Sequence, residues 1–301
     1  MNSLNMFSMG TTHQTIYYPE VKAFHVALPS RSEQDSITGL LGALDDKIEL
    51  NRRINETLEA MARAGFKDWF VDFGPTRAKM EGHDSYLSPK LWDLFPDALD
   101  EEGKPVGWSR KPLDEIAQFL NGLALQKFPA SDSDDSLPVI KITELRGGIT
   151  PKSDRASQSV PNKYIIKDGD FLFSWSGSLI AKFWTEGDGA LNQHLFKVTS
   201  DQFPSWFFSQ WVHHHLDEFR AIAASKATTM GHIQRRHLKE AITILPPDGV
   251  LAQLGQIVSP LVEHTIKNAL ESRTLAETRD LLLPKLMSGE IRLRNVEKTT
   301  E

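Results

Sequence analysis

The stretch Leu44-Asp-Asp-Lys-Ile-Glu-Leu-Asn51 lies in the middle of a long segment that has the residue pattern of a helix. Apolar and small polar residues recur there at alternating spacings of four and three, which is the stripe of a coiled coil. The stripe consists of Ile37, Leu41, Leu44, Ile48, Asn51, Asn55, Leu58 and Ala62. The pattern predicts a helix of about 30 residues over Glu33–Ala64, about 45 Å long at 1.5 Å per residue.

The same layout occurs twice in the chain. A shift of 217 residues aligns Thr11–Leu58 with Thr228–Leu275 without a gap and gives ten identities, where chance would give roughly three. The second stripe consists of Leu254, Val258, Leu261, Thr265, Asn268, Ser272, Leu275, Arg279 and Leu282. Both stripes turn polar in the middle, at Asn51 and Asn268, and polar stripe residues can fix the register of paired helices. The repeat therefore favours two helices that pair with each other, with two separate amphipathic helices on a globular core as the alternative. The expected seam between the helices is formed by Leu44, Ile48, Asn51, Leu58, Leu261, Asn268 and Leu275.

The segment between the two helices has a different pattern. Short apolar runs bounded by glycine turns predict strands over Leu137–Ile142, Tyr164–Ile166, Asp170–Trp175, Leu179–Trp184 and His194–Val198. A helical, aromatic stretch follows over Pro204–Ala224. The expected fold class is α+β, with one mixed α/β domain flanked by two long antiparallel coiled-coil helices. The expected division of the chain is 1–27 remnant of a preceding domain, 28–75 first long helix, 76–104 acidic linker, 105–245 mixed domain, and 246–301 second long helix and tail.

Composition excludes several classes of protein. The 301 residues include no cysteine, which excludes a disulfide scaffold and thiol catalysis and suits a reducing cytoplasm. The sequence contains no run of about 18 apolar residues, so no membrane span is predicted. The net charge of −6 argues against a nucleic-acid binder, but the acid is concentrated in Glu81–Glu102, which carries seven acids and one base. Lys141–Lys182 and Lys226–Lys239 are net basic, so a local basic surface is compatible with the acidic total.

Enzyme motifs give little support for catalysis. A phosphate-binding P-loop, a dinucleotide-binding glycine motif and a His-Glu-x-x-His zinc motif are all missing from the sequence. His213-His214-His215 is expected on an exposed helix, where consecutive side chains diverge, so no metal site and no cofactor are predicted. A nuclease that uses Asp97, Glu102 and Lys104 is the enzymatic alternative, although these residues lie in the acidic linker without flanking strands.

The remaining polar constellation suits DNA binding. Amides and arginines can read base edges, while hydroxyls and lysines can hold phosphates. The candidate DNA-binding residues are Lys141, Arg146, Lys152, Arg155, Lys163, Ser176, Ser178, Lys182, Asn192, Gln193, His194, Lys226, Thr228, Thr229, His232, Gln234, Arg235 and Arg236. For Asn192 and Gln193 the alternative is that they brace a buried turn.

Several motifs in a fixed order give the chain a family resemblance. They are Leu28-Pro29 with Glu33-Gln34 and Ile37, Leu44–Asn51, Phe66-Lys-Asp-Trp-Phe-Val-Asp-Phe73, Pro105-x-Gly-Trp108, Ser176–Ile180, Asn192-Gln-His194 and Leu283–Ile291. In this order the chain resembles the DNA-specificity subunit of type I restriction–modification systems. The resemblance implies a noncatalytic subunit that reads one half of a bipartite target in double-stranded DNA. It also implies docking of methyltransferase subunits on the helices, with restriction/translocase subunits as further partners.

The chain departs from the family pattern in one respect. A full specificity subunit has two target recognition domains, and here only one is complete, with 1–27 matching the tail of another. The expectation is a half-length subunit or a truncated product, whose two copies could associate to restore a two-domain reader. A scaffold that binds methyltransferase partners without reading DNA is a further alternative.

Overall fold

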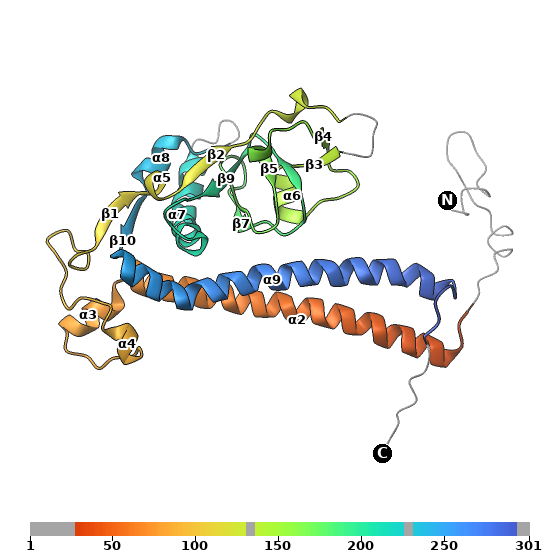
Figure 1. Cartoon of the computed structure of the whole chain (residues 1–301), viewed down its shortest axis with the longest axis horizontal. Helices are drawn as coiled ribbons and strands as arrows, with labels where there is room; N and C mark the ends of the chain where they lie inside the picture. Colours follow the sequence, from red (N-terminus) through yellow and green to blue (C-terminus); the bar gives the residue numbers. More distant parts are fainter. Residues whose placement is uncertain (1–27, 131–135, 226–230, 294–301) are drawn as a thin grey trace, which may run out of the picture. The chain divides into compact units, whose positions relative to one another are not determined.

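The structure is a computed structural model that describes residues 28–130, 136–225 and 231–293. Two long helices, α2 and α9, and a mixed central domain make up most of it (Figure 1). The chain divides into two compact units, Ile48–Thr274 and Met1–Lys47 with Leu275–Glu301. The expected domain remnant at 1–27 lies outside the described residues.

Helix α2 runs over Arg31–Phe70 and is longer than the pattern predicts. Ser30 and Glu33 begin it with a capping box, in which Glu33 N donates to Ser30 Oγ at 3.3 Å and Ser30 N donates to Glu33 Oε2 at 2.8 Å. At its other end Phe66, Trp69 and Phe70 recur at helical spacing and are buried. Their burial stabilises one further turn and a half beyond the polar stripe.

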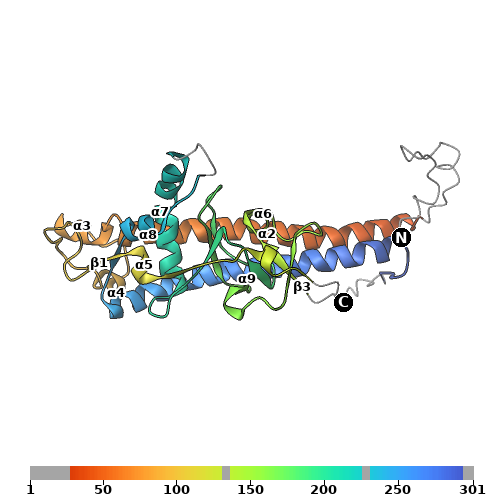
Figure 2. The same cartoon turned by 90° about the horizontal axis from the view of Figure 1, so that it is seen from above.

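Helix α9 runs over Asp248–Met287 and pairs antiparallel with α2, side by side in both views (Figures 1 and 2). Asn268 Nδ2 donates to Asn55 Oδ1 at 2.9 Å, and Asn55 Nδ2 donates to the Thr265 carbonyl at 3.0 Å. The pairing of the two helices is thus confirmed, and the alternative of separate amphipathic helices is wrong. All seven expected seam residues are buried or part-buried in the structure.

The acidic segment is more ordered than a linker. It contains α3 over Gly74–Met80 and α4 over Pro89–Trp92. Phe95 is 2% exposed and packs against Trp69 and Trp108, while Lys79 Nζ donates to the Phe95 carbonyl at 2.6 Å. Apolar residues spaced among the acids therefore fold this segment onto the end of α2.

The central domain contains three small sheets. The first pairs β1 (Ser109–Pro112) with β10 (Ile242–Leu245). The second is antiparallel, with β2 (Gln118–Asn121), β9 (Leu195–Thr199), β6 (Phe171–Ser174) and β7 (Ala181–Phe183) in that order. The third has the order β4 (Arg155–Ser157), β3 (Ser136–Ile140), β8 (Gly189–Leu191) and β5 (Ile165–Ile166), with β3 and β8 parallel. The helices of the domain are α5 (Leu113–Ile116), α6 (Ile142–Gly147), α7 (Ser205–Ser225) and α8 (Arg235–Glu240), with 3-10 turns at Leu125–Lys127 and Asn162–Tyr164.

Strand β8 is an element that the sequence pattern does not predict. Gly187-Asp-Gly189 reads as a turn, yet Gly189 begins a buried strand between β3 and β5. A Cβ at Gly189 would lie 2.5 Å from Ile140 Cγ1, so only glycine permits the close approach of β8 to β3. The five strands that the pattern predicts are present as β3, β5, β6, β7 and β9, which confirms the α+β class.

An aromatic hub joins α2 to the central domain. It consists of Phe66, Trp69, Phe70, Phe73, Phe95, Trp108, Trp206, Phe207 and Trp211, all under 9% exposed. Phe70 lies 5.4 Å from Phe207 and 5.6 Å from Trp108, between ring centroids, at distances typical of favourable aromatic pairs. Leu251, Leu254, Val258 and Val262 of α9 belong to the same core. Phe73, which follows α2, has a φ of 56°, and this left-handed residue turns the chain out of the helix.

Candidate nucleic-acid interface

Three loops of the central domain converge on Trp175, directly after β6. Its indole Nε1–H is shared between Asn121 Oδ1 at 2.8 Å and the Gln193 carbonyl at 3.0 Å. The His194 ring lies against the indole with 5.6 Å between ring centroids, and the His232 ring meets it edge-on at 6.2 Å. Seven residues from four segments of the chain form this Trp175 cluster: Asn121, Trp175, Ser176, Gln193, His194, His232 and Arg235.

His194 is the most constrained polar side chain of the Trp175 cluster that still reaches the surface. Its Nδ1 shares a 3.0 Å hydrogen bond with Ser176 Oγ, and Ser176 is 3% exposed. The ring plane is fixed by Trp175 on one side. Within the described part of the chain, His194 Nε2 has no hydrogen-bond partner. The imidazole is therefore held in one orientation with one nitrogen available to a bound molecule.

The segment before α8 completes the cluster. Gly177 N donates to the Gly231 carbonyl at 2.8 Å, and Ile233 N donates to the Trp175 carbonyl at 2.9 Å. These bonds hold His232 beside Ser176. Arg235, at the start of α8, donates from Nη2 to the Phe119 carbonyl at 3.1 Å and lies over the Phe196 ring at 5.8 Å. Its guanidinium is thus positioned at the edge of the cluster.

Asn192 has a different role from its neighbours. Its side chain is 5% exposed, and its Oδ1 accepts a hydrogen bond from His194 N at 3.2 Å. A Cβ at Gly122 would lie 2.2 Å from the Asn192 carbonyl, so the two backbones touch here. This geometry fits the bracing interpretation for Asn192, while the part-exposed Gln193 remains at the surface.

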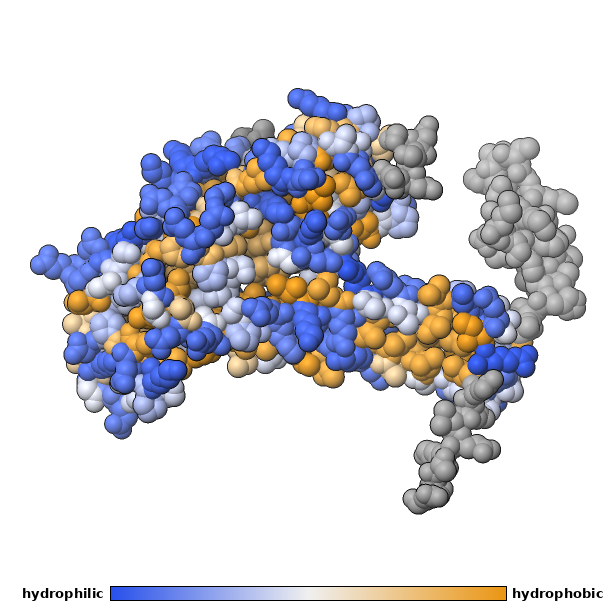
Figure 3. Space-filling model, in the orientation of Figure 1, coloured by the Kyte–Doolittle hydropathy of each residue, from blue (hydrophilic) through white to orange (hydrophobic). Residues whose placement is uncertain are grey.

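Most of the other basic candidates form a second group around β3 and β4. Lys141 pairs with Asp154, Arg155 Nε donates to Ser136 Oγ at 2.9 Å, and Lys163 lies 5.1 Å from the Tyr164 ring centroid. Lys152 and Arg146 are exposed. Hydrophilic residues predominate along the upper edge of the central domain in Figure 3.

A hollow of about 450 Å³ has Gly177 and Gly231 in its lining, and these glycines adjoin Ser176 and His232 of the Trp175 cluster in sequence. Arg146, Ser178, Arg220 and Gly231 are among its lining residues. The Arg220 guanidinium is held there by hydrogen bonds of 3.2 Å from Nε and Nη2 to the Leu179 carbonyl. Two arginines beside a serine hydroxyl and a backbone glycine provide donors of the kind that hold a phosphate.

Lys182 is not brought together with the other candidates. It lines a cavity of about 290 Å³ with Arg63 and His213, between β7, α7 and the two long helices. Gln234 and Arg236 are exposed at the start of α8, close to the cluster in sequence and structure. Lys226, Thr228 and Thr229 lie outside the described residues.

Sequence reasoning missed Trp175, Asn121 and Arg220. Trp175 interrupts the polar stretch Ser174–Ser178, and a part-exposed tryptophan among hydroxyls is a usable signal of a binding surface. Asn121 and Arg220 carry no such signal, because they reach the site only through the pairing of β2 with β9 and the packing of α7.

The histidine triplet corrects one expectation. His215 is 9% exposed, stacks on Trp211, and shares a 3.0 Å hydrogen bond through Nε2 with the Ile242 carbonyl. His213 faces the cavity beside Phe171, and only His214 is exposed. The expectation of an exposed helix is therefore wrong, because the aromatic face of α7 is wide enough to bury His215 and to cover part of His213.

Two residues of the nuclease alternative, Glu102 and Lys104, lie in a tight turn with Asp100. Asp100 Oδ1 accepts hydrogen bonds from the backbone N–H groups of Glu102 and Lys104 at 3.0 and 3.2 Å. The Lys104 ammonium pairs with Asp100 and Glu102, and Asp97 is exposed outside this turn. In the ranges that the structure describes, no group of three or more potential metal ligands is assembled. These contacts account for Lys104 and Glu102 as turn residues.

The comparison with known families decides the assignment. The model of the type I restriction modification DNA specificity domain matches residues 105–277, more than half of the chain. The chain belongs to this family. The matched residues of this specificity-family protein comprise the central domain and most of α9.

Individual relatives agree with this assignment. The chain is 26% identical to the type I restriction enzyme HindI specificity subunit of Haemophilus influenzae, over 94% of this chain and 72% of the relative. It is also 26% identical to the MjaIX specificity subunit of Methanocaldococcus jannaschii, over 97% of this chain and 66% of the relative. The chain thus spans about two thirds to three quarters of the length of these relatives.

A solved structure shares the fold. The S subunit of a type I restriction-modification system from M. genitalium superposes with a TM-score of 0.52 at 16% identity, over 93% of this chain and 68% of that one. Helices long enough and apolar enough to cross a membrane do not occur among the described residues.

Proposed function

We propose that this chain is a noncatalytic, sequence-specific DNA-binding subunit of a type I restriction–modification complex. In this proposal the central domain reads one half of a bipartite target, and α2 and α9 dock methyltransferase subunits. The observation that carries it is the family match over 105–277, which coincides with the domain that presents the Trp175 cluster. The cluster supports the proposal because its polar edges are oriented by internal hydrogen bonds before any ligand arrives.

Charge is compatible with this function. The excess acid lies in the segment folded against the end of α2, away in sequence from the basic stretches of the central domain. The proposal assigns Arg146, Arg220 and Arg235 to contacts with phosphates or base edges. Methyltransferase subunits would share the phosphate contacts, so the specificity subunit needs only moderate basicity of its own.

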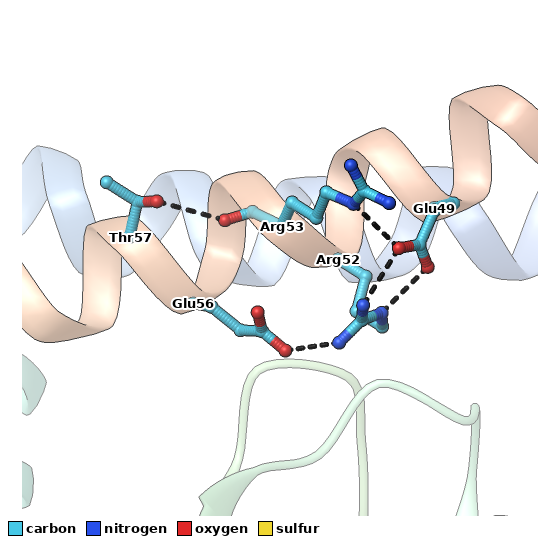
Figure 4. Close-up of polar contacts among 5 residues, drawn as sticks. All are labelled: Glu49, Arg52, Arg53, Glu56 and Thr57. Carbon is cyan, nitrogen blue, oxygen red and sulfur yellow. Dashed lines mark hydrogen bonds and ion pairs between the residues drawn. The ribbon is translucent and has the colours of Figure 1, made fainter.

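The outer face of α2 supports docking of a partner. Leu50 and Met61 are 51% and 55% exposed and are eleven residues apart, which is about three helical turns, so they share one face. Glu49 and Arg53 lie beside Leu50 on the helix, and the Glu49 carboxylate accepts hydrogen bonds from Arg52 and Arg53 (Figure 4). These hydrogen bonds from the two guanidinium groups lower the pKa of Glu49 to about 2. An apolar pair rimmed by such charges is typical of a protein interface.

The first experiment identifies the target. Genomic DNA from cells that carry this gene and its methyltransferase is sequenced for methylated bases, and a defined bipartite motif is expected. DNA binding is then measured with the assembled complex over a range of salt concentrations. A shift that requires the methyltransferase but shows no sequence preference would favour the scaffold alternative, and cleavage by the purified chain with Mg²⁺ alone would favour the nuclease.

The second experiment tests the Trp175 cluster. The His194→Ala variant should lose affinity for the methylated motif by about 5- to 150-fold, the range of one base contact, with little loss for unrelated DNA. His83→Ala is the matched control, since His83 is exposed in the acidic segment. Equal affinity of the His194→Ala and wild-type complexes for the motif would contradict the assignment of His194.

The third experiment tests docking. Leu50→Glu combined with Met61→Glu should abolish capture of the methyltransferase without lowering the unfolding midpoint, because both side chains are exposed. Gln256→Glu, at an exposed position of α9, is the control. Undiminished capture by the double variant would place the docking surface elsewhere.

A further inference from the structure

An arginine of α9 contacts the central domain at a point separate from the aromatic hub. Arg273 donates from Nη1 to Asp168 Oδ1 at 3.0 Å and from Nη2 to Asp168 Oδ2 at 2.9 Å. Nη1 also donates to the Thr185 carbonyl at 2.7 Å. Both side chains of the pair are 29% exposed. Two parallel bonds between a guanidinium and a carboxylate fix direction as well as distance.

Asp168 is itself rigidly held within the domain. Its Oδ1 accepts a hydrogen bond from Gly187 N at 2.8 Å, and the Gly187 carbonyl accepts one from Trp184 Nε1 at 2.6 Å. Trp184 is fully buried in the second core of the domain, with Ile140, Leu172 and Leu195. Gly187 has a φ of 86°, and a Cβ there would lie 3.7 Å from Arg273 Nη1. The contact is thus connected through hydrogen bonds to a core distinct from the aromatic hub.

The two contact points are well separated along α9. Val262 is the last α9 residue buried in the hub core and the part-buried Ile266 packs against that core. Arg273 lies seven residues beyond Ile266, about 10 Å along the helix. The cavity of about 290 Å³ lies beside the helices between them, lined by Thr265, Ile266 and Ala269 of α9. The cavity interrupts close packing between the domain and the helices, so the hub by itself would hold the domain at one end only. A single contact region permits rocking, whereas two separated ones define an orientation.

We infer that the Arg273–Asp168 pair is the second attachment of the central domain to α9, and that Arg273 is a positioning residue for DNA recognition. The pair sets the direction in which the Trp175 cluster faces relative to the helices. Its consequence for DNA rests on the proposed function, since a domain that reads half of a target must present its surface at a defined angle to the partner subunits. A misdirected domain would lose affinity without losing its own fold.

Electron paramagnetic resonance distance measurements test the attachment directly. The chain has no cysteine, so spin labels can be placed at single introduced cysteines, Asn162→Cys on the domain and Gln256→Cys on α9. Arg273→Ala should broaden the distance distribution, and Arg273→Lys, which keeps the charge but cannot form the parallel bonds, should broaden it less. Arg279→Ala is the matched control, because Arg279 on the same helix pairs with Asp45 of α2 and not with the domain. A distribution as narrow in Arg273→Ala as in the wild type would overturn the inference.

DNA binding by the assembled complex tests the positioning role. Arg273→Ala should raise the DNA concentration for half-maximal methylation by at least about fivefold, with an unchanged rate at saturating DNA. Arg279→Ala should leave both values unchanged. A broadened distance distribution with unchanged DNA dependence would overturn the positioning role. If the wild-type complex binds no DNA, the proposed function fails, and the distance measurement alone decides the attachment.

Discussion

The three consecutive histidines of α7 show how burial decides the chemistry of single residues. Burial lowers the pKa of His213 to about 4, and the charges of Arg63 and Arg220 lower it further in the same direction. Burial also lowers the pKa of the more exposed His214, with the neighbouring His215 adding to the effect. His213 is therefore neutral in the folded protein at neutral pH.

This environment predicts acid sensitivity. The unfolded chain binds a proton at His213 near pH 6.5, whereas the folded chain does so only near pH 4, so stability falls as pH falls through this window. At 1.36 kcal/mol per pH unit, the loss is up to roughly 3 kcal/mol. Denaturant unfolding at pH 7 and pH 4.5 should show a smaller pH dependence for His213→Gln than for the wild type. His264→Gln, at an exposed position of α9, should behave like the wild type. The same pH dependence in wild type and His213→Gln would contradict this account.

At the scale of elements, a polar layer decides how α2 and α9 pair. Asn51 and Asn268 are 1% and 5% exposed. Asn51 Nδ2 donates to Glu271 Oε2 at 2.8 Å and to Ser272 Oγ at 3.2 Å, both on α9. Asn51 Oδ1 is buried and has no hydrogen-bond partner among the described residues. An orphaned acceptor costs stability, so this layer contributes alignment of the helices more than free energy.

The polar layer predicts opposite effects of single and double substitution. Asn268→Leu alone should lower the free energy of unfolding by about 1–3 kcal/mol, because Asn55 Oδ1 then loses its hydrogen-bond donor between the helices. Asn55→Leu combined with Asn268→Leu removes both side chains of that hydrogen bond and should recover most of this loss, but with mixed oligomeric states, because the register is no longer specified. Chemical denaturation measures the change in stability and light scattering measures the oligomeric state. Gln256→Leu, at an exposed position of α9, is the control. A double variant that is less stable than the single variant and has one uniform oligomeric state would contradict the prediction.

At the scale of the whole molecule, the repeat makes the two helix ends comparable. The shift of 217 residues places Leu283, Leu286 and Met287 of α9 in the positions of Phe66, Trp69 and Phe70 of α2. The α2 residues are buried in the aromatic hub, whereas Leu283 and Met287 are 44% and 51% exposed. Leu28 and Leu281, in the same compact unit, are 76% and 61% exposed. By the repeat, this end of α9 corresponds to the end of α2 that binds the central domain. On α9, two of its apolar residues lie at the surface.

These exposed residues predict self-association through the α9 end. Two copies should assemble in the presence of the methyltransferase, because each could place apolar surface on Leu283 and Met287, which are four residues apart and share one face of α9. Leu283→Glu combined with Met287→Glu should then give complexes with one copy, measured by light scattering after size separation. Ile257→Glu, at a less exposed apolar position of α9, is the control. One copy per complex in the wild type would contradict the prediction.

The sequence by itself determined the two long helices, five of the strands and the family, and its repeat favoured pairing of the long helices. The stripe through Leu44 and Asn51, its repeat at Leu261 and Asn268, and the strand patterns all depend on local periodicity, which a single chain displays directly. It also indicated His194 as a DNA-binding candidate, whereas the candidate Ser176 is buried and orients the His194 ring.

Only the tertiary structure decided which of these residues act together. Asn121 and Arg220 join the candidate surface, Asn192 turns inward, and Lys182 faces the helices, because sheet pairing and helix packing set side-chain direction across large sequence separations. Gly189 entered a strand instead of a turn because Ile140 occupies the space of its missing Cβ. The Arg273–Asp168 pair joins residues 105 positions apart, and since ion pairs between distant segments leave no periodic trace, the sequence pattern carries no sign of it.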